Sequence, residues 1–166
     1  MARYSVSYAQ MTTSAVADNA SLTTLTYGAL GGNSGTMQLK INEVQCGGEA
    51  SSAAVQAMVL GRDSTVAATS LTSVGMSNQL LDATATAPGT VALFSNTSTT
   101  KPIRGSNAHL LNQSFNAFGG LVRWQARQGE EITTVGNTAS LGEVSYSGTT
   151  GTVAATVSWH IIYELV

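Results

Sequence analysis

The C-terminal segment most restricts the fold of this chain, because apolar residues occupy every second position there. From Val153 to Leu165 they alternate with residues that are mostly small or polar. Strict alternation with period two is typical of a β-strand that turns one face to a core and the other to solvent. At roughly 3.3 Å per residue the run would be about 40 Å long, so we expect a bend or bulge in it. The pattern predicts an all-β scaffold rather than an α/β enzyme.

Further strands are predicted where short apolar runs lie between turn residues. These runs are segments 4–8, 37–44, 90–94, 121–126, 131–135 and 139–146. Segment Ala53–Leu60 fits a short helix or a strand buried on both faces, and its Ser and Gly neighbours favour the strand. The turn Arg127–Glu130 predicts a hairpin that joins segments 121–126 and 131–135. About eight strands without a helical period indicate one β-sandwich or barrel domain over residues 1–166.

The composition indicates a surface with little charge. Only 10% of the 166 residues are charged, against about 25% in a typical globular protein, whereas Ser and Thr number 41. Such a surface suits contact with other protein more than dispersion in water. A β-domain that its own hydroxyl groups keep in solution is the other interpretation, and the composition leaves both open.

Charge and hydropathy disfavour several partners. The net charge is −2 and the seven Lys and Arg residues are scattered, which argues against a nucleic-acid partner. No segment approaches the roughly 18 apolar residues of a membrane span, and the N-terminus lacks the apolar region of a signal peptide. We therefore expect a protein made in the cytoplasm that does not enter a membrane.

Residue types that carry catalysis or bind metals are few. His109 and His160 are the only histidines, Cys46 is the only cysteine, and neither a C-x2-C spacing nor a G-x-S-x-G motif occurs. Glu130 and Glu131 are adjacent, so on a strand they would face opposite ways and make a poor acid–base pair. We predict no catalytic residue, no metal site and no cofactor.

The aromatic residues of the C-terminal run allow two interpretations. Trp159 and Tyr163 fall on one face, where they would form either part of the core or a platform for stacking sugars. Trp159 lies between Val157 and Ile161 on the face that the alternation buries, and this favours the core.

Two packing patterns resemble those of a known family. They are R-W-x-A-x-x-G-E at Arg123–Glu130 and I-I-Y-E at Ile161–Glu164, and they follow an early strand at Lys40–Val44. In this order they resemble the small jelly-roll proteins encoded among the head genes of tailed bacteriophages, which act as capsid decoration, or cement, proteins. The matching pieces cover about a third of the chain, and neither pattern is a catalytic signature.

The resemblance implies an antiparallel, jelly-roll-like β-sandwich of about eight strands that binds the outer surface of an icosahedral phage capsid. Such a protein stabilises the lattice of the major capsid protein without catalysis, lies on the exterior of the virion and is often a homotrimer. We expect its capsid contacts in the loops 28–35 and 95–100 or in the N-terminal segment 2–8, with Arg3, Tyr4, Ser5, Gly31, Asn33, Asn96 and Thr99 as the candidate residues. Residues 2–8 fit equally well an ordinary strand that pairs within the sheet.

Two other functions are compatible with the chain. A carbohydrate- or receptor-binding β-sandwich on a virion or cell surface predicts a solvent-exposed aromatic residue such as Tyr27, Tyr146 or Tyr163. An enzyme on a cupin-like jelly roll would need several histidines and a carboxylate around a metal, and two distant histidines disfavour it.

Overall fold

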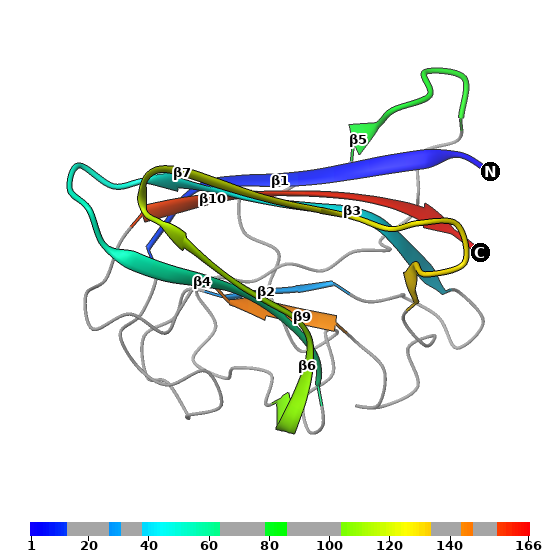
Figure 1. The fold of residues 1–166 in the computed structure, drawn as a ribbon. Coiled ribbons are helices and arrows are strands. Elements are labelled where there is room, and N and C mark those ends of the chain that lie inside the picture. Colours follow the sequence, from blue (N-terminus) through cyan, green and yellow to red (C-terminus); the bar gives the residue numbers. More distant parts are fainter. Residues whose placement is uncertain (13–26, 31–37, 64–78, 86–103, 134–143, 148–155) are drawn as a thin grey trace.

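The described part of the chain is built from β-strands in two layers (Figure 1). The computed structural model describes residues 1–12, 27–30, 38–63, 79–85, 104–133, 144–147 and 156–166. Its strands are β1 (Arg3–Thr12), β2 (Tyr27–Leu30), β3 (Leu39–Glu49), β4 (Val55–Asp63), β5 (Gln79–Leu80), β6 (Arg104–Asn116), β7 (Phe118–Gln125), β8 (Ile132–Thr133), β9 (Val144–Ser147) and β10 (Thr156–Leu165). The predicted all-β, antiparallel β-sandwich is confirmed.

The strands of the two sheets pair in a regular order. Sheet A has the order β5-β1-β10-β3-β7, with β8 also beside β3, and sheet B has the order β2-β9-β4-β6. Early strands pair with late ones in reverse order: β1 with β10, β2 with β9, β3 with β7 and β4 with β6. The chain therefore forms a long antiparallel ribbon, and the β10–β3 and β9–β4 ladders fold this ribbon into two sheets.

The C-terminal strand β10 confirms the alternation seen in the sequence. Its inward side chains Val157, Trp159, Ile161 and Tyr163 are at most 2% exposed, and the residues between them are partly exposed. The interpretation of Trp159 and Tyr163 as core residues is therefore confirmed. Residues 153–155 of the predicted run lie outside the described residues.

The predicted irregularity is present, but its extra residues belong to the neighbours of β10. The β1 ladder shifts register between Tyr8 and Met11, and β3 carries Asn42 as an extra residue where Ile162 and Tyr163 are paired. A bulge on a neighbour lets a long strand twist while keeping its own alternation unbroken.

The core lies between the inner faces of the two sheets. Tyr4 of β1 stacks on Tyr163 of β10, with ring centroids 5.6 Å apart and planes at 25°. Sheet B contributes Met58, Leu60 and Phe115 to the same cluster. The N-terminal segment is therefore a strand of the sheet, as one of the two sequence interpretations has it.

Two local predictions have opposite outcomes. The strand prediction for Ala53–Leu60 is confirmed, because β4 is a strand and every residue from Gln56 to Gly61 is buried. The predicted hairpin of 121–126 with 131–135 is wrong. Both β7 and β8 pair with β3 along one edge, and the chain between them loops out opposite Asn42. Gly129, at φ +86°, allows the loop to turn back to the same edge.

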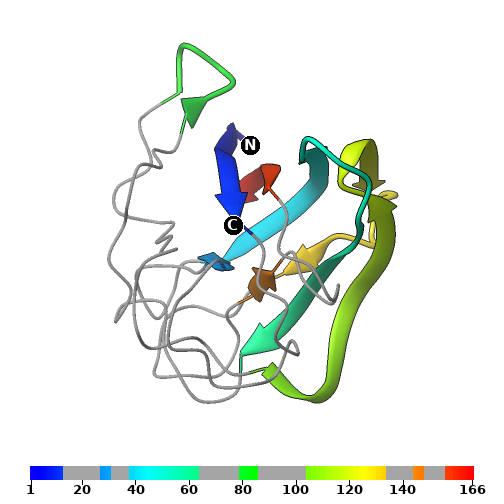
Figure 2. The same ribbon diagram turned by 90° about the vertical axis from the view of Figure 1, so that its left-hand side faces the viewer.

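One end of the sandwich is a corner where the β3/β7 ribbon continues into β4/β6. The β3–β4 and β6–β7 connections run side by side from one sheet to the other (Figure 2). Ala117, in the β6–β7 connection, forms backbone hydrogen bonds to both ends of the β3–β4 connection. Its carbonyl accepts from the Ala50 N–H at 3.0 Å, and its N–H donates to the Ala54 carbonyl at 2.8 Å. Gly48 fits here because a Cβ would lie 2.1 Å from the Ala117 oxygen. The chain termini lie at the opposite end (Figure 1).

Candidate functional site

The predicted capsid contacts are not gathered into one site by the structure. Arg3 is on the surface, with its side chain 64% exposed, and it pairs with Glu164 at 3.0 Å. Tyr4 and Ser5 are buried, at 5% and 6% exposure, so their side chains are not available to a partner and we drop them from the contact set. The other four predicted contacts, Gly31, Asn33, Asn96 and Thr99, lie outside the described residues.

The most exposed apolar side chains within the described strands lie at the corner between the sheets. Val55, Phe118 and Leu121 are 72%, 60% and 68% exposed. We call these three residues the apolar corner. Single exposed apolar residues are common on protein surfaces, but three around one turn of a ribbon are typical of a surface that another molecule covers.

Strand alternation places these three side chains on the same convex face. Through the turn, Phe115 and Ala117 are buried while Asn116 and Phe118 are exposed. Val55 is paired with Asn116, so it lies beside that outward residue. The outer faces of both sheets form one continuous face of the bent ribbon. The apolar corner lies on this face at the point where the ribbon bends.

Small residues around the corner leave the apolar side chains accessible. Leu121 is paired with Gly47, which has no side chain to cover it; a Cβ added at Gly47 would lie 3.8 Å from the Leu121 methyl group. A hollow of about 380 Å³ lies on the sheet B side, lined by Ala53, Ala54, Val55, Ser114, Phe115 and Asn116. The corner thus combines projecting apolar groups with a neighbouring recess, which suits contact with a protein surface.

The sequence analysis does not predict the apolar corner, although the sequence contains one indication of it. Val122 and Trp124 mark the inward phase of β7, so Leu121 had to fall on the outward face despite being apolar. An apolar residue out of phase with its strand is evidence for an interface. The exposure of Phe118 could not be predicted in this way, because it depends on the register shift between Gly47 and Glu49.

The outer face of sheet A is polar and its charges are paired. Ser7 and His160 are neighbours across the β1–β10 ladder, and Ser7 Oγ lies 2.6 Å from His160 Nδ1. Arg123 donates to both carboxylate oxygens of Glu43, at 2.7 and 2.9 Å, and Gln45 also donates to Glu43. The hydrogen bond from Arg123 lowers the pKa of Glu43 against the opposing effect of its partial burial.

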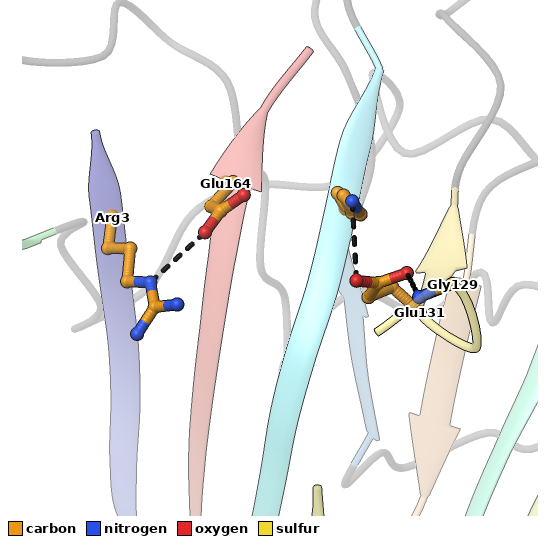
Figure 3. Close-up of polar contacts among 5 residues, drawn as sticks. Arg3, Gly129, Glu131 and Glu164 are labelled. Atoms are coloured by element: carbon orange, nitrogen blue, oxygen red, sulfur yellow. Dashed lines mark hydrogen bonds and ion pairs between the residues drawn. The ribbon is translucent and has the colours of Figure 1, made fainter. Parts of the chain in front are cut away.

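A polar pocket of about 260 Å³ lies on this face at the bulge of β3. We call it the bulge pocket; its polar lining is Arg3, Asn42, Glu43, Gln125, Gln128 and Glu131. Figure 3 shows two of these lining residues with their partners: Arg3 donates to Glu164, and Glu131 accepts from the Gly129 N–H.

The groups most suited to catalysis or metal binding are not assembled in the described residues. Cys46 is buried, and burial raises the pKa of its thiol. His160 contacts Ser7, whereas His109 lies in β6 of the other sheet. Over the described ranges, no group of three or more His, Cys, Asp or Glu residues could hold a metal ion. In the same part of the chain, no helix is long and apolar enough to cross a membrane.

Of the three tyrosines that the carbohydrate-binding alternative expects at the surface, only Tyr163 has a described side chain. It is completely buried, so it cannot stack on a sugar at the surface. Tyr27 and Tyr146 lie in β2 and β9, where the structure describes the backbone alone. No family model and no curated protein matches the chain.

Proposed function

We propose that this chain is a structural virion protein that binds the outer surface of an icosahedral phage capsid through its apolar corner and stabilises the coat lattice. The observation that carries the proposal is the exposure of Val55, Phe118 and Leu121 on one crest of the sandwich. Burying side chains of this size contributes about 1.5–3 kcal/mol each, and aromatic residues are enriched in interfaces. Three such groups form a compact anchor of the kind on which protein contacts depend.

The strand pairing supports the family resemblance on which the proposal also draws. In a jelly roll a long antiparallel ribbon is folded over to give two four-stranded sheets. The ladders β1–β10, β2–β9, β3–β7 and β4–β6 follow that scheme, so we interpret the sandwich as a jelly roll. Jelly rolls also occur in lectins and cupins, so the fold alone does not favour a capsid role. The proposal of a capsid role therefore depends on the exposed apolar corner.

The mechanism of stabilisation would be mass action. A protein that binds the assembled lattice but not free coat subunits stabilises the lattice by an amount that grows with its concentration relative to Kd. If three copies act together, as in the homotrimer that the resemblance implies, each weak corner contact gains from the others by avidity. The low charge of the chain agrees with an interface built from apolar and hydroxyl groups.

A cosedimentation assay with coat shells of the same virus tests the proposal. Replacing Phe118 and Leu121 by Ser should weaken binding by about 100-fold, at about tenfold or more for each anchor. Leu81, which is 50% exposed beyond β5 and near the chain termini, provides the matched control, and Leu81→Ser should bind like the unaltered protein. Equal binding by the corner variant and the control would refute docking through the corner.

A further inference from the structure

The free edge of sheet B is a feature that docking through the corner does not use. Sheet B ends at β6, whose other side pairs with no described strand, and Figure 2 shows this yellow-green strand at the right-hand end of the strands. The opposite end of the sheet is β2, which has four residues, whereas β6 has 13. A long strand at the end of a sheet presents N–H and C=O groups that another strand can bind.

This edge lacks the side chains that usually prevent strands from pairing. Between Arg104 and Arg123 the chain contains no Lys, Arg, Asp, Glu or Pro. Charged residues and Pro are the common protection of natural edge strands, and β7, the end strand of sheet A, carries Arg123. The edge of β6 is therefore open to a neutral strand.

The pairing with β4 determines which backbone groups of β6 face this edge. The Ala117 N–H donates to the Ala54 carbonyl at 2.8 Å, so these residues form a hydrogen-bonded pair in the β4–β6 ladder. In an antiparallel ladder such pairs recur at every second residue, which directs the backbone groups of Gln113 to β4. The N–H and C=O groups of Asn112 and Ser114, on either side of Gln113, therefore point to the free edge.

A β-bulge limits the regular part of the edge. Leu110 is an extra residue of β6, because Leu60 pairs with Leu111 and Gly61 with His109. A bulge twists an edge strand and ends regular pairing. The regular segment is therefore 111–116, and Gln113 is at the middle of its first five residues.

Segment 111–115 is complementary to an antiparallel copy of itself about Gln113. On the inner face, Leu111 would lie opposite the partner's Phe115, and Leu111 packs against the core but is only partly buried. On the outer face, the exposed Asn112 would lie opposite the partner's Ser114. The two Gln113 amides meet at the axis, where each can donate and accept. Moving the axis by one residue would instead place Leu111 or Phe115 opposite Gln113, so the axis at Gln113 is favoured.

We propose that two copies of this chain pair along β6, with Asn112 opposite the partner's Ser114, so that their B sheets form one continuous sheet. A second copy is the occupant that the edge selects, because its apolar and amide residues match themselves and no charge opposes the pairing. A two-fold contact uses the same segment in both chains, so it closes with two copies.

The inference goes beyond the capsid function and does not rest on it. Residues paired across an antiparallel ladder turn their side chains to the same side of the sheet. The outer faces of the two copies, and with them both apolar corners, would therefore lie on one side of the dimer. Two corners held together would bind a lattice with higher avidity than one.

Sedimentation equilibrium of the unaltered chain tests the dimer. Measurements from about 5 μM to about 1 mM cover the weak affinities expected of one short strand pair. The average mass should rise with concentration from that of one chain to that of two and go no higher. A mass that stays at one chain, or that reaches the three chains implied by the family resemblance, would overturn the proposal.

Two charge variants test the register. Asn112→Lys with Ser114→Lys sets like charges opposite each other at both outer pairs, whereas Asn112→Lys with Ser114→Glu sets opposite charges there. The dimer of the second variant should be about tenfold tighter or more, at about threefold for each pair. Both changes affect exposed side chains, so both variants should keep a similar urea midpoint. Equal dimerisation by the two variants would disprove the pairing.

A corner variant and shell binding separate this proposal from corner docking. The Phe118→Ser, Leu121→Ser protein should dimerise like the unaltered chain, because both residues lie outside the paired segment. Loss of its dimer would assign the contact to the corner and overturn the proposal. A chain that stays monomeric, and whose Asn112→Lys, Ser114→Lys variant loses shell binding, would assign the edge to a strand of the coat protein instead.

Discussion

Replacing Gly48 by Ala tests whether the corner depends on the close approach of two backbones. An added Cβ would lie 2.1 Å from the Ala117 oxygen, 2.4 Å from its carbonyl carbon and 2.6 Å from its Cα. All three are backbone atoms, so no change of rotamer relieves the overlap. Restoring an ordinary contact of 3.4 Å requires the β6–β7 turn to move by about 1.3 Å.

That movement determines the size of the effect. Overpacking of this kind costs about 1–3 kcal/mol. The displaced Ala117 would also weaken its hydrogen bonds to Ala50 and Ala54, each with a net value of about 1 kcal/mol. The sum is about 3–5 kcal/mol, a large share of the roughly 5–15 kcal/mol that stabilises a typical domain.

Urea unfolding followed by tryptophan fluorescence measures the loss. With a slope of about 2 kcal/mol per molar urea, Gly48→Ala should lower the midpoint by about 2 M. Gly47→Ala should stay within about 0.5 kcal/mol of the unaltered protein, because its Cβ would meet the movable Ser158 hydroxyl at 3.2 Å and the Leu121 methyl group at an ordinary 3.8 Å. Gly129→Ala should fall between them, at about 1–2 kcal/mol, from its positive φ alone. A Gly48→Ala midpoint equal to that of Gly47→Ala would refute the backbone contact.

Three further predictions concern the core and the outer face. Met58→Ala should lower the free energy of unfolding by about 2–5 kcal/mol in the same urea assay, because Met58 is completely buried between the sheets. Since the folded-state pKa of Glu43 is lowered, its ion pair with Arg123 stabilises the fold above the unfolded pKa near 4.5, and this contribution is lost as pH falls through the folded pKa. Glu43→Gln should therefore flatten the acid limb of a thermal-midpoint profile, and an unchanged limb would contradict the pairing. Cys46 should react with a thiol reagent only after unfolding, because it is fully buried and burial raises its pKa; rapid labelling of the native protein would show that β3 opens.

The strands of sheet A could be predicted from sequence because each has one buried and one wetter face. The alternation in β10 and in most of β3 directly reflects this asymmetry, whereas at the start of β1 the polar Ser5 is buried along with Tyr4 and Val6. The strand β4 was harder to predict, because burial on both faces removes the alternation. Only the length of the apolar run and its flanking residues then indicate a strand. The hairpin error at 127–130 has a clear origin: turn residues show that the chain changes course, but not which neighbour the next strand will join.

The surface features were less predictable than the strands. The predicted capsid contacts Tyr4 and Ser5 lie in the N-terminal segment, which the structure places in the sheet as β1 beside β10, and both side chains are buried there. The apolar corner results from a register shift and a change of sheet, and the bulge pocket from one extra residue in β3. Such irregularities depend on long-range pairing, which local periodicity does not report.

Cryo-electron microscopy of coat shells incubated with the purified chain tests the central claim most directly. The account predicts copies ordered on the outer lattice, with Val55, Phe118 and Leu121 buried against coat protein and the face of sheet A that carries the bulge pocket turned to solvent. Shells that remain bare, or bound copies whose apolar corner faces solvent, would contradict it.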